Sequence, residues 1–348
     1  MSDRFKPLAQ ANISVILSPY QLPRLAIDAP VLIDFIDKQL CYCHGESGQY
    51  NRSLIIFGEH LSADVLHQLL PPLVELNQLP LHLYRYQPLA EMSPAVVISG
   101  FADEPMVVQL QGQIAKYSTD LDVEMALLDD IANTPVLNQP GLLVMDMDST
   151  AIEIECIDEI AALAGVGEEV AAVTRLAMQG ELDFAQSLTQ RIAKLAGADE
   201  SILATVAKNL PLMPGLVELV ACLQNKGWQV VIASGGFTYF TQLLQQQLGL
   251  TATFANQLEI IDGKVTGKVL GDIVDADTKA AVISAVAKEH GIATTQTVAV
   301  GDGANDLKML NKAALGVAFH AKPVVREQAK AAVNKGSLLQ LLYLLGAH

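Results

Sequence analysis

Two aspartates follow an apolar run of strand length and could carry chemistry together. Asp146 and Asp148 come directly after residues 142–145 and are followed by the hydroxyl residues 149–150. On an extended backbone, residues two apart point to the same side, so both carboxylates would converge on one small volume. Their repulsion then requires a bound divalent cation or a proton retained on one of them. The alternative is a turn whose polar residues merely cap the next helix.

Further polar groups stand where they could meet this pair. In chain order they are Ser234 with Gly235, then Lys279, then Asp302 with Asn305 and Asp306. The first and last groups directly follow apolar runs at 229–233 and 297–300. Because parallel strands end at one edge of a sheet, we expect these groups to converge with the aspartate pair. Taken alone, a lysine at a helix start is typical of a solvated surface residue.

The order of the predicted elements favours an α/β domain over residues 141–348. Apolar runs that alternate with helical patterns indicate a doubly wound, Rossmann-like parallel sheet. Asp262-Gly263 predicts a type I′ turn that joins strands at 257–261 and 264–270. The segment from about 152 to 210 contains only helical patterns, so we expect an inserted helical cap over the polar edge. The apolar segment 338–345 is expected to form a helix that docks on a sheet.

Residues 1–135 predict a separate α+β domain. The patterns indicate strands at 31–36, 40–43, 53–57, 81–86 and 95–99, with helices at 62–70, ended by Pro71-Pro72, and at 104–130. This order is typical of an antiparallel sheet covered on one face, as in ferredoxin-like or ACT-like domains. A proline-containing linker is expected at 133–141. The domain is a candidate for regulation or homodimer assembly, with a structural appendage as the alternative.

Composition excludes several classes of protein. The formal net charge is −16 and the pI about 4.7, whereas a protein that binds nucleic acid needs a basic face. No run reaches the roughly 18 apolar residues of a membrane helix, so no membrane partner is expected. The four irregularly spaced cysteines do not suggest a disulfide framework. We therefore expect a soluble, cytoplasmic protein that acts on a small molecule.

The combined motifs resemble those of the haloacid dehalogenase (HAD) superfamily of aspartate-nucleophile phosphatases. The resemblance rests on Asp146-Met147-Asp148-Ser149-Thr150, Ser234, Lys279 and Gly301-Asp302-Gly303-Ala304-Asn305-Asp306. Within that superfamily, residues 146–161 (DMDSTAIEIECIDEIA) with Met178, Phe184 and Arg191 resemble the bacterial phosphoserine phosphatases with an N-terminal extension. The resemblance covers residues 141 to about 335. It implies hydrolysis of O-phospho-L-serine to L-serine and phosphate, the last step of serine biosynthesis.

The resemblance also implies a covalent mechanism at the strand ends. Asp146 would attack phosphorus to give an aspartyl-phosphate. Asp148 would protonate the leaving oxygen and later accept a proton from the attacking water. Mg²⁺ suits hard oxygen ligands, which by resemblance are the Asp146 side chain, the Asp148 backbone carbonyl and the Asp302 side chain.

By the same resemblance, the remaining polar groups bind the phosphoryl group or support the metal. Ser234 and the Gly235 N–H would donate to phosphoryl oxygens. Lys279 would supply a positive charge to this group and to the nucleophile. Asn305 would contact the phosphoryl group or orient the lysine, and Asp306 would lie behind the metal or its waters.

Substrate choice is expected to lie in the cap. Glu155 would take the substrate ammonium, and Arg191 would take its carboxylate through a bidentate fork. Met178 and Phe184 would close the apolar side and exclude water. As alternatives, the charged pair could be ordinary surface residues and the apolar pair ordinary core. Three neighbouring acids compete for the role of Glu155, namely Glu153, Asp158 and Glu159.

Two other functions remain open from the sequence. The same chemistry would serve another small phosphomonoester, such as phosphothreonine or phosphohomoserine. A non-enzymatic alternative is an amino-acid-sensing module in which the N-terminal domain controls assembly, and this role could coexist with catalysis.

Overall fold

The computed structural model describes residues 6–7, 31–36, 39–44, 51–77, 81–101 and 104–346. The chain forms two compact units. One comprises Met1–Thr134 with Gln340–His348, and the other comprises Pro135–Leu339. Within the described residues, no helix combines the length and the apolar character needed to cross a bilayer.

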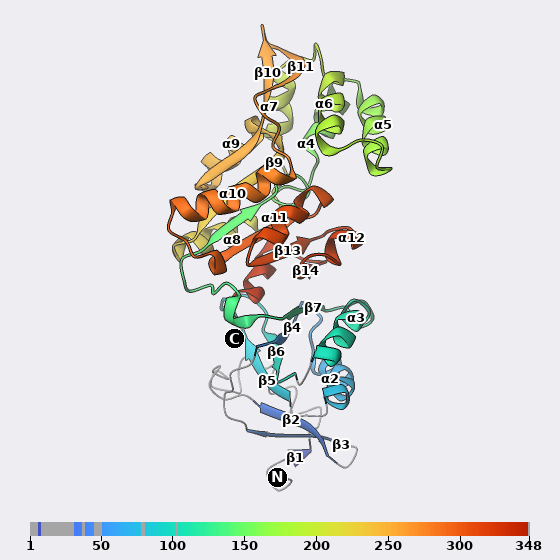
Figure 1. The fold of residues 1–348 in the computed structure, drawn as a ribbon, viewed down its shortest axis with the longest axis vertical. Helices are drawn as coiled ribbons and strands as arrows, with labels where there is room; N and C mark the ends of the chain where they lie inside the picture. The colour runs from blue at the N-terminus through green and yellow to red at the C-terminus, as the bar shows by residue number, and fades with distance from the viewer. Residues whose placement is uncertain are drawn as a thin grey trace. The chain divides into compact units, whose positions relative to one another are not determined.

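The Pro135–Leu339 unit is built on a seven-stranded sheet in the order β11-β10-β9-β8-β12-β13-β14. Its strands are β8 (Leu142–Met145), β9 (Gln229–Phe237), β10 (Ala252–Ile261), β11 (Lys264–Leu270), β12 (Thr297–Gly301), β13 (Leu315–Phe319) and β14 (Ala331–Val333). Neighbours from β10 to β14 run parallel, and β11 pairs antiparallel with β10. β8 lies in the middle of this sheet (Figure 1). The predicted doubly wound sheet is confirmed.

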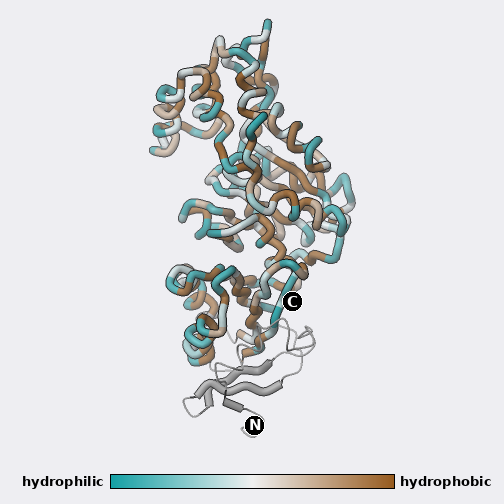
Figure 2. The backbone as a smooth tube through the Cα atoms, turned by 180° about the vertical axis from the view of Figure 1, so that it is seen from behind, coloured by the Kyte–Doolittle hydropathy of each residue, from teal (hydrophilic) through white to brown (hydrophobic). Residues whose placement is uncertain are grey.

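Helices cover both faces of this sheet (Figure 1). They are α8 (Leu216–Asn225) and α9 (Thr238–Leu248) on one side, and α10 (Ala276–Glu289) and α11 (Leu307–Lys312) on the other, with the short α12 (Pro323–Arg326) beside β13. Val282 and Ile283 of α10 pack on Val144 of β8 in a fully buried cluster. Figure 2 shows the corresponding strands in brown, the hydrophobic end of its scale. Burial of each such side chain contributes about 1.5–3 kcal/mol.

The predicted cap is the helical segment between β8 and β9. It contains α4 (Cys156–Leu163), α5 (Gly167–Met178), α6 (Phe184–Lys194) and α7 (Ser201–Lys208). Backbone hydrogen bonds join the α6–α7 connection to β11, since Gly197 N donates to Val265 O at 2.8 Å and Val265 N donates to Ala198 O at 2.9 Å. The hairpin at the sheet edge therefore anchors one side of the cap.

The predicted type I′ hairpin is confirmed. Asp262 and Gly263 have φ values of 50° and 73°, and Ile261 pairs with Lys264. β10 begins at Ala252, five residues before the predicted start at 257, because its first half pairs in parallel with β9. That pairing is a tertiary contact which the local pattern does not contain.

The first unit is also built on a seven-stranded sheet, in the order β1-β3-β2-β5-β6-β4-β7. Its elements are β1 (Lys6–Pro7), β2 (Val31–Ile36), β3 (Gln39–His44), β4 (Ser53–Phe57), α2 (Ala63–Asn77), β5 (Leu81–Tyr86), β6 (Ala95–Ser99), α3 (Glu104–Leu121), β7 (Glu124–Leu128) and the 3₁₀ helix η2 (Ile131–Asn133). The order β4-α2-β5-β6-α3-β7 with antiparallel neighbours is the expected ferredoxin-like arrangement. β2 and β3 extend it as a hairpin beside β5.

The prediction that a helix ends before Pro71 is wrong. α2 runs through Pro71 and Pro72 to Asn77. Each proline removes a backbone donor and crowds the preceding turn. Leu69 and Leu73, on either side of the prolines, are 0% and 1% exposed against the sheet. Packing of the apolar face therefore outweighs the local cost.

The predicted helix over 104–130 is two elements. α3 ends at Leu121, where Asp122 takes the left-handed φ of 53°, and the chain then forms β7. The β7 sequence EMALL consists mainly of good helix formers, so its pattern does not indicate a strand. Pairing with β4, from Phe57 opposite Glu124 to Ser53 opposite Leu128, decides the conformation.

The end of the chain also differs from the prediction, which placed all of 141–348 in the second domain. Residues from Gln340 onward, in the 3₁₀ helix η5 (Leu338–Leu344), group with the first unit. Tyr343 stacks on Phe57 of β4 with ring centroids 4.8 Å apart, and its hydroxyl donates to Ser93 O. An apolar segment by itself does not specify a sheet. Here the stacking of Tyr343 on Phe57 and the hydrogen bond of its buried hydroxyl determine which sheet the segment packs against.

Gly316→Ala is expected to destabilise the second unit by about 3 kcal/mol, since a Cβ at this position would overlap the backbone carbonyl of Leu310. Denaturant unfolding followed by fluorescence of Trp228, the chain's single tryptophan and 2% exposed, measures this loss. Gly167→Ala is the matched control, because its Cβ would meet Ala162 Cα at an ordinary 3.7 Å. Equal midpoints for both variants would contradict the argument.

Candidate active site

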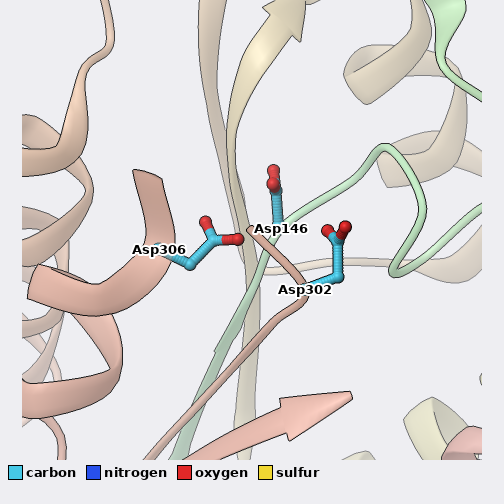
Figure 3. A group of neighbouring side chains, drawn as sticks. All are labelled: Asp146, Asp302 and Asp306. Atoms are coloured by element: carbon cyan, nitrogen blue, oxygen red, sulfur yellow. The ribbon is translucent and has the colours of Figure 1, made fainter. Parts of the chain in front are cut away.

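The polar groups predicted to converge meet at the carboxyl end of β8. Asp146 N extends the ladder by one residue, donating to Val300 O at 3.0 Å, and its side chain then turns into the site. Asp302 follows β12, and Asp306 ends the 3₁₀ helix η4 (Ala304–Asp306). Carboxylate oxygens of these three residues lie within 4.8 Å of one another. Figure 3 shows the Asp146 side chain between the other two.

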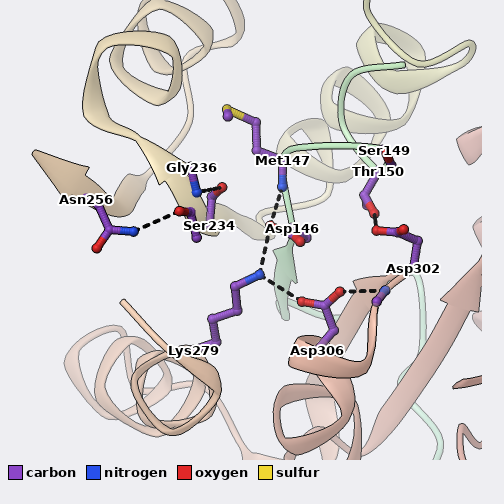
Figure 4. Close-up of polar contacts among 12 residues, drawn as sticks. Asp146, Met147, Ser149, Thr150, Ser234, Gly236, Asn256, Lys279, Asp302 and Asp306 are labelled. Atoms are coloured by element: carbon purple, nitrogen blue, oxygen red, sulfur yellow. Dashed lines mark hydrogen bonds and ion pairs between the residues drawn. The ribbon is translucent and has the colours of Figure 1, made fainter. Parts of the chain in front are cut away.

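Lys279 joins two of these carboxylates. Its Nζ lies 2.8 Å from Asp146 Oδ1 and 2.8 Å from Asp306 Oδ1, and the residue is 0% exposed (Figure 4). Burial by itself lowers the pKa of Lys279, but the two carboxylates outweigh that effect and hold it above its usual value. The lysine is therefore a buried, charged part of the site, and the surface alternative is wrong.

Both carboxylate oxygens of Asp306 have partners within the protein. Oδ1 pairs with Lys279, and Oδ2 accepts a hydrogen bond from Gly303 N at 3.0 Å. A Cβ on Gly301 would stand 2.5 Å from Asp306 Cγ, so the close approach of β12 requires glycine there. Asp306 thus orients the lysine and the loop that carries Asp302.

Ser234 and Gly235 lie at the end of the neighbouring strand β9. Ser234 is 0% exposed, and its Oγ accepts from Gly236 N at 2.8 Å. A side chain on Gly235 would collide with the ring of Phe184, the first residue of α6, so the cap residue lies directly on this glycine. The structure therefore places the cap residue Phe184 beside Ser234 and Gly235, whose binding of phosphate remains a prediction.

Asn256 supports this loop, although its sequence context did not predict that role. Asn256 Nδ2 donates to Gly235 O at 2.8 Å (Figure 4), and its Oδ1 accepts from Val274 N at 2.9 Å. The side chain is 2% exposed on β10. The one signal in the sequence that could have indicated this role is a single asparagine within a strand. A buried side-chain amide in a strand needs specific hydrogen-bond partners.

Asp148 occupies a different environment from Asp146. Its Oδ1 accepts from Cys156 N, the first N–H of α4, at 3.0 Å. Burial, followed by the charge of Glu155, raises the pKa of Asp148 to about 7, although the Cys156 donors oppose the shift. This carboxyl can hold a proton near neutral pH, as a proton donor must.

Glu155 and Arg191 face this part of the site from the cap. Glu155 Oε1 accepts from Ser149 Oγ at 2.8 Å, and Ser149 adopts a left-handed φ of 55°. Arg191 lies in the last turn of α6, and its buried Nε has no hydrogen-bond partner within the described part of the chain. Burial lowers the pKa of Arg191, while Asp158 and then Glu155 oppose the shift. An unpaired guanidinium donor suits a carboxylate ligand.

Two predicted residues are not brought into the buried group. Met178 ends α5 and is 69% exposed, so in this conformation it closes no apolar wall. The Asn305 side chain lies against Gly303, whereas the contacts of Lys279 are made with Asp146 and Asp306. Their predicted roles remain predictions.

The carboxylates fit a divalent cation. Burial, with the charges of Asp306 and Glu155, raises the pKa of Asp302 to about 7. Burial and Asp306 also raise the pKa of Asp146 well above its usual value, although Lys279 opposes this. The single positive charge of Lys279 does not balance the three neighbouring carboxylates, two of them buried and that of Asp302 half-buried. Hard oxygen donors at this spacing suit a small divalent ion. Thr150 Oγ1 donates to Asp302 Oδ1 at 3.3 Å and orients it.

A doubly wound sheet with a helical cap and an Asp-Lys-Asp group at its carboxyl edge defines a hydrolase of the haloacid dehalogenase type. A profile of haloacid dehalogenase-like hydrolases matches residues 141–314. The chain belongs to this family.

Its relatives include phosphoserine phosphatases. The chain is 55% identical over 247 residues to the phosphoserine phosphatase of Haemophilus influenzae, which covers 70% of this chain and 78% of the relative. The unliganded structure of a probable phosphoserine phosphatase from Vibrio cholerae has a TM-score of 0.70 at 45% identity, covering 84% of this chain and 86% of that one. A phospho-aspartyl intermediate analogue of phosphoserine phosphatase has a TM-score of 0.57 at 40% identity, covering 60% and 99%.

Lys279→Met is expected to lower the free energy of unfolding by about 3–5 kcal/mol, because it leaves two buried carboxylates without their cation. Adding Asp306→Asn removes one of those charges and should recover part of the loss. Trp228 fluorescence in denaturant, with a chelator present, measures both variants. An unchanged midpoint for Lys279→Met would show that the ion pair does not stabilise this unit.

Proposed function

We propose that this chain hydrolyses O-phospho-L-serine to L-serine and phosphate, with Asp146 as the nucleophile. The observation that carries the proposal is the buried Lys279–Asp146 ion pair of 2.8 Å at the end of β8. It fixes one carboxylate at the ligand edge of the sheet and places a positive charge beside it. The phosphoserine phosphatase relatives, and the phospho-aspartyl analogue of one such enzyme, support this choice.

In the first step, an oxygen of Asp146 forms a bond to phosphorus. The bond between phosphorus and the serine oxygen breaks, and its electron pair passes to that oxygen. Asp148 supplies the proton that completes the serine hydroxyl, a role that its raised pKa of about 7 permits. Ser234 and the Gly235 N–H donate to the phosphoryl oxygens, and Lys279 offsets their negative charge.

In the second step, water attacks phosphorus and gives its proton to Asp148. The bond between phosphorus and Asp146 breaks, which restores the carboxylate and releases phosphate. Asp148 thus alternates between acid and base, so the free enzyme is regenerated after one turnover. Because it releases serine, this reaction is the last step of serine biosynthesis.

We propose Mg²⁺ as the divalent ion, held by the side chains of Asp146 and Asp302 and by the backbone carbonyl of Asp148. When bound, it supplies positive charge that reduces repulsion between the carboxylates and a phosphate ester. The close spacing of the Asp146 and Asp302 carboxylates and their raised pKa values support this assignment.

Substrate selection is proposed to rest on the cap. Glu155 takes the ammonium, and Arg191 takes the carboxylate with its unpaired guanidinium donor. Phe184, lying over Gly235, excludes water from the phosphoryl group. Met178 is proposed to complete the apolar wall, and Asn305 to contact the phosphoryl group or orient Lys279.

The first unit is proposed to regulate or assemble the enzyme. Its support is a separate sheet with its own buried core, such as Leu54 and Leu66, both 0% exposed. Calorimetric titration of the intact chain with serine tests a ligand role, and sedimentation equilibrium tests a homodimer. A monomer that gives no heat with serine would reduce this unit to a structural appendage.

Asp146→Asn is expected to lower phosphate release from O-phosphoserine by roughly 10⁴-fold, since the amide is a poor nucleophile. Acid quenching with phosphorus-labelled substrate should place label on Asp146 in the wild type and none in the variant. Asp262→Asn is the matched control, because that exposed turn position accepts asparagine at φ 50°. Full activity in Asp146→Asn would disprove the mechanism.

Arg191→Lys is expected to raise KM for O-phosphoserine roughly tenfold, because a lysine cannot make the bidentate fork. O-phosphoethanolamine has the ammonium but lacks the carboxylate, so its KM should stay within about twofold. The matched control is Arg175→Lys, at an exposed position in the last turn of α5. An equal change for both esters would remove Arg191 from carboxylate recognition and favour another phosphomonoester.

A further inference from the structure

Strand β9 contains a bulge where its end forms the proposed phosphate-binding loop. Ala233 of β9 lies opposite Phe254 of β10 in the parallel ladder. The pair that follows is Phe237 opposite Asn256, so β9 advances by four residues (233 to 237) while β10 advances by two (254 to 256). The bulge places residues 234–236 outside the regular ladder, so their backbone groups need other partners.

The side chain of Asn256 supplies one of those partners. Its Nδ2 donates to Gly235 O at 2.8 Å (Figure 4), and its Oδ1 accepts from Val274 N at 2.9 Å. A backbone carbonyl only accepts and a backbone N–H only donates, so these two contacts fix which end of the amide faces the bulge. Because Asn256 is 2% exposed, water has little access to either contact.

The peptide between Gly235 and Gly236 connects Asn256 to Ser234. The carbonyl of this peptide accepts from Asn256, and its N–H, which belongs to Gly236, donates to Ser234 Oγ at 2.8 Å (Figure 4). The peptide group is planar and rigid, so both of its polar ends are held at once. A rotation of the plane would break both hydrogen bonds together.

The contact with Gly236 also determines what the Ser234 hydroxyl can do. Because the Gly236 N–H is the donor, Ser234 Oγ accepts there and keeps its own hydrogen for another acceptor. Within the part of the chain that the structure describes, Ser234 Oγ makes no other hydrogen bond. The point that a Cβ on Gly236 would occupy lies 3.1 Å from Ser234 Oγ and 2.7 Å from Asp148 Oδ2, so this hydroxyl lies at the site.

We propose that Asn256 is a positioning residue: by fixing the Gly235–Gly236 peptide, it directs the hydroxyl hydrogen of Ser234 toward the phosphoryl group. The proposal deepens the proposed function and rests on Ser234 as a donor to a phosphoryl oxygen. Asn256 acts through Ser234 and contributes no atom to the reaction. Without the amide, the peptide is free to rotate, and Ser234 loses the contact that orients its hydroxyl.

A double-mutant cycle between Asn256→Ala and Ser234→Ala tests the proposal in the full chain with Mg²⁺. The quantity measured is kcat/KM for p-nitrophenyl phosphate, which carries neither the ammonium nor the carboxylate of phosphoserine. Recognition by Glu155 and Arg191 therefore does not enter the result. We expect Ser234→Ala to lower kcat/KM roughly 10²-fold, as the loss of one donor to developing negative charge does.

Asn256→Ala alone is expected to lower kcat/KM roughly tenfold, because Ser234 keeps its hydroxyl but loses its orientation. Added to Ser234→Ala, the same change should lower kcat/KM by less than about twofold, since the group through which Asn256 acts is already absent. A purely structural role of Asn256 would give the same factor in both backgrounds.

Two further variants separate the lost hydrogen bond from lost packing. Asn77→Ala is the matched control, because Asn77 is also 2% exposed and its Nδ2 donates to a glycine carbonyl, Gly100 O, at 3.0 Å in the first unit. Its kcat/KM should equal that of the wild type. Asn256→Leu keeps the buried volume but has no donor, so it should repeat the result of Asn256→Ala. Fluorescence of Trp228 checks that each variant is folded at the assay temperature.

Equal factors for Asn256→Ala in both backgrounds, or no effect in the wild type, would overturn the proposal while Ser234 remains a phosphoryl donor. If Ser234→Ala itself left kcat/KM unchanged, the proposal and this part of the proposed function would both fail. In a wild type that hydrolyses p-nitrophenyl phosphate but not O-phosphoserine, the proposed substrate is wrong, and the cycle still decides the role of Asn256.

Discussion

The second unit depends on a buried lysine held between two carboxylates. Removing Lys279 from water is costly, and only close pairing with Asp146 and Asp306 compensates for that cost. The pairing fixes α10 against the ends of β8 and β12. The pairing also explains why position 301 requires glycine, since a Cβ there would stand 2.5 Å from Asp306 Cγ. Stability and reactivity therefore share one interaction.

Environment separates the carboxylates that the sequence presents as similar. Asp146 pairs with the buried Lys279 ammonium, which favours its ionised form and opposes the rise in pKa that burial and Asp306 cause. Asp148 accepts a hydrogen bond from the first backbone N–H of α4, and its raised pKa of about 7 suits a proton carrier. Two like residues can thus perform acid and nucleophile roles at the same pH. The cap participates in this separation because its first helix begins at Cys156.

In the first unit, tertiary contacts outweighed several local signals. Pro71 and Pro72 predict a helix end. The helix α2 nevertheless continues, because leucines on both sides of the prolines are buried against the sheet. The β7 sequence is typical of a helix, yet its antiparallel pairing with β4 makes it a strand. In each case the deciding free energy comes from residues distant in the chain. A window of local sequence contains no record of those contacts.

The sequence by itself determined the parallel sheet, the hairpin at Asp262 and the polar groups that end β8, β9 and β12, because periodicity and turn chemistry are local properties. Only the tertiary structure decided which of those groups touch. It places Lys279, which the sequence alone predicts to lie on the surface, in a buried ion pair. It also places Asn256 in hydrogen-bond contact with Gly235, 21 residues away. It also gave Asp148 a partner in Cys156. Such partners depend on how separate elements pack, which no single stretch of the chain encodes.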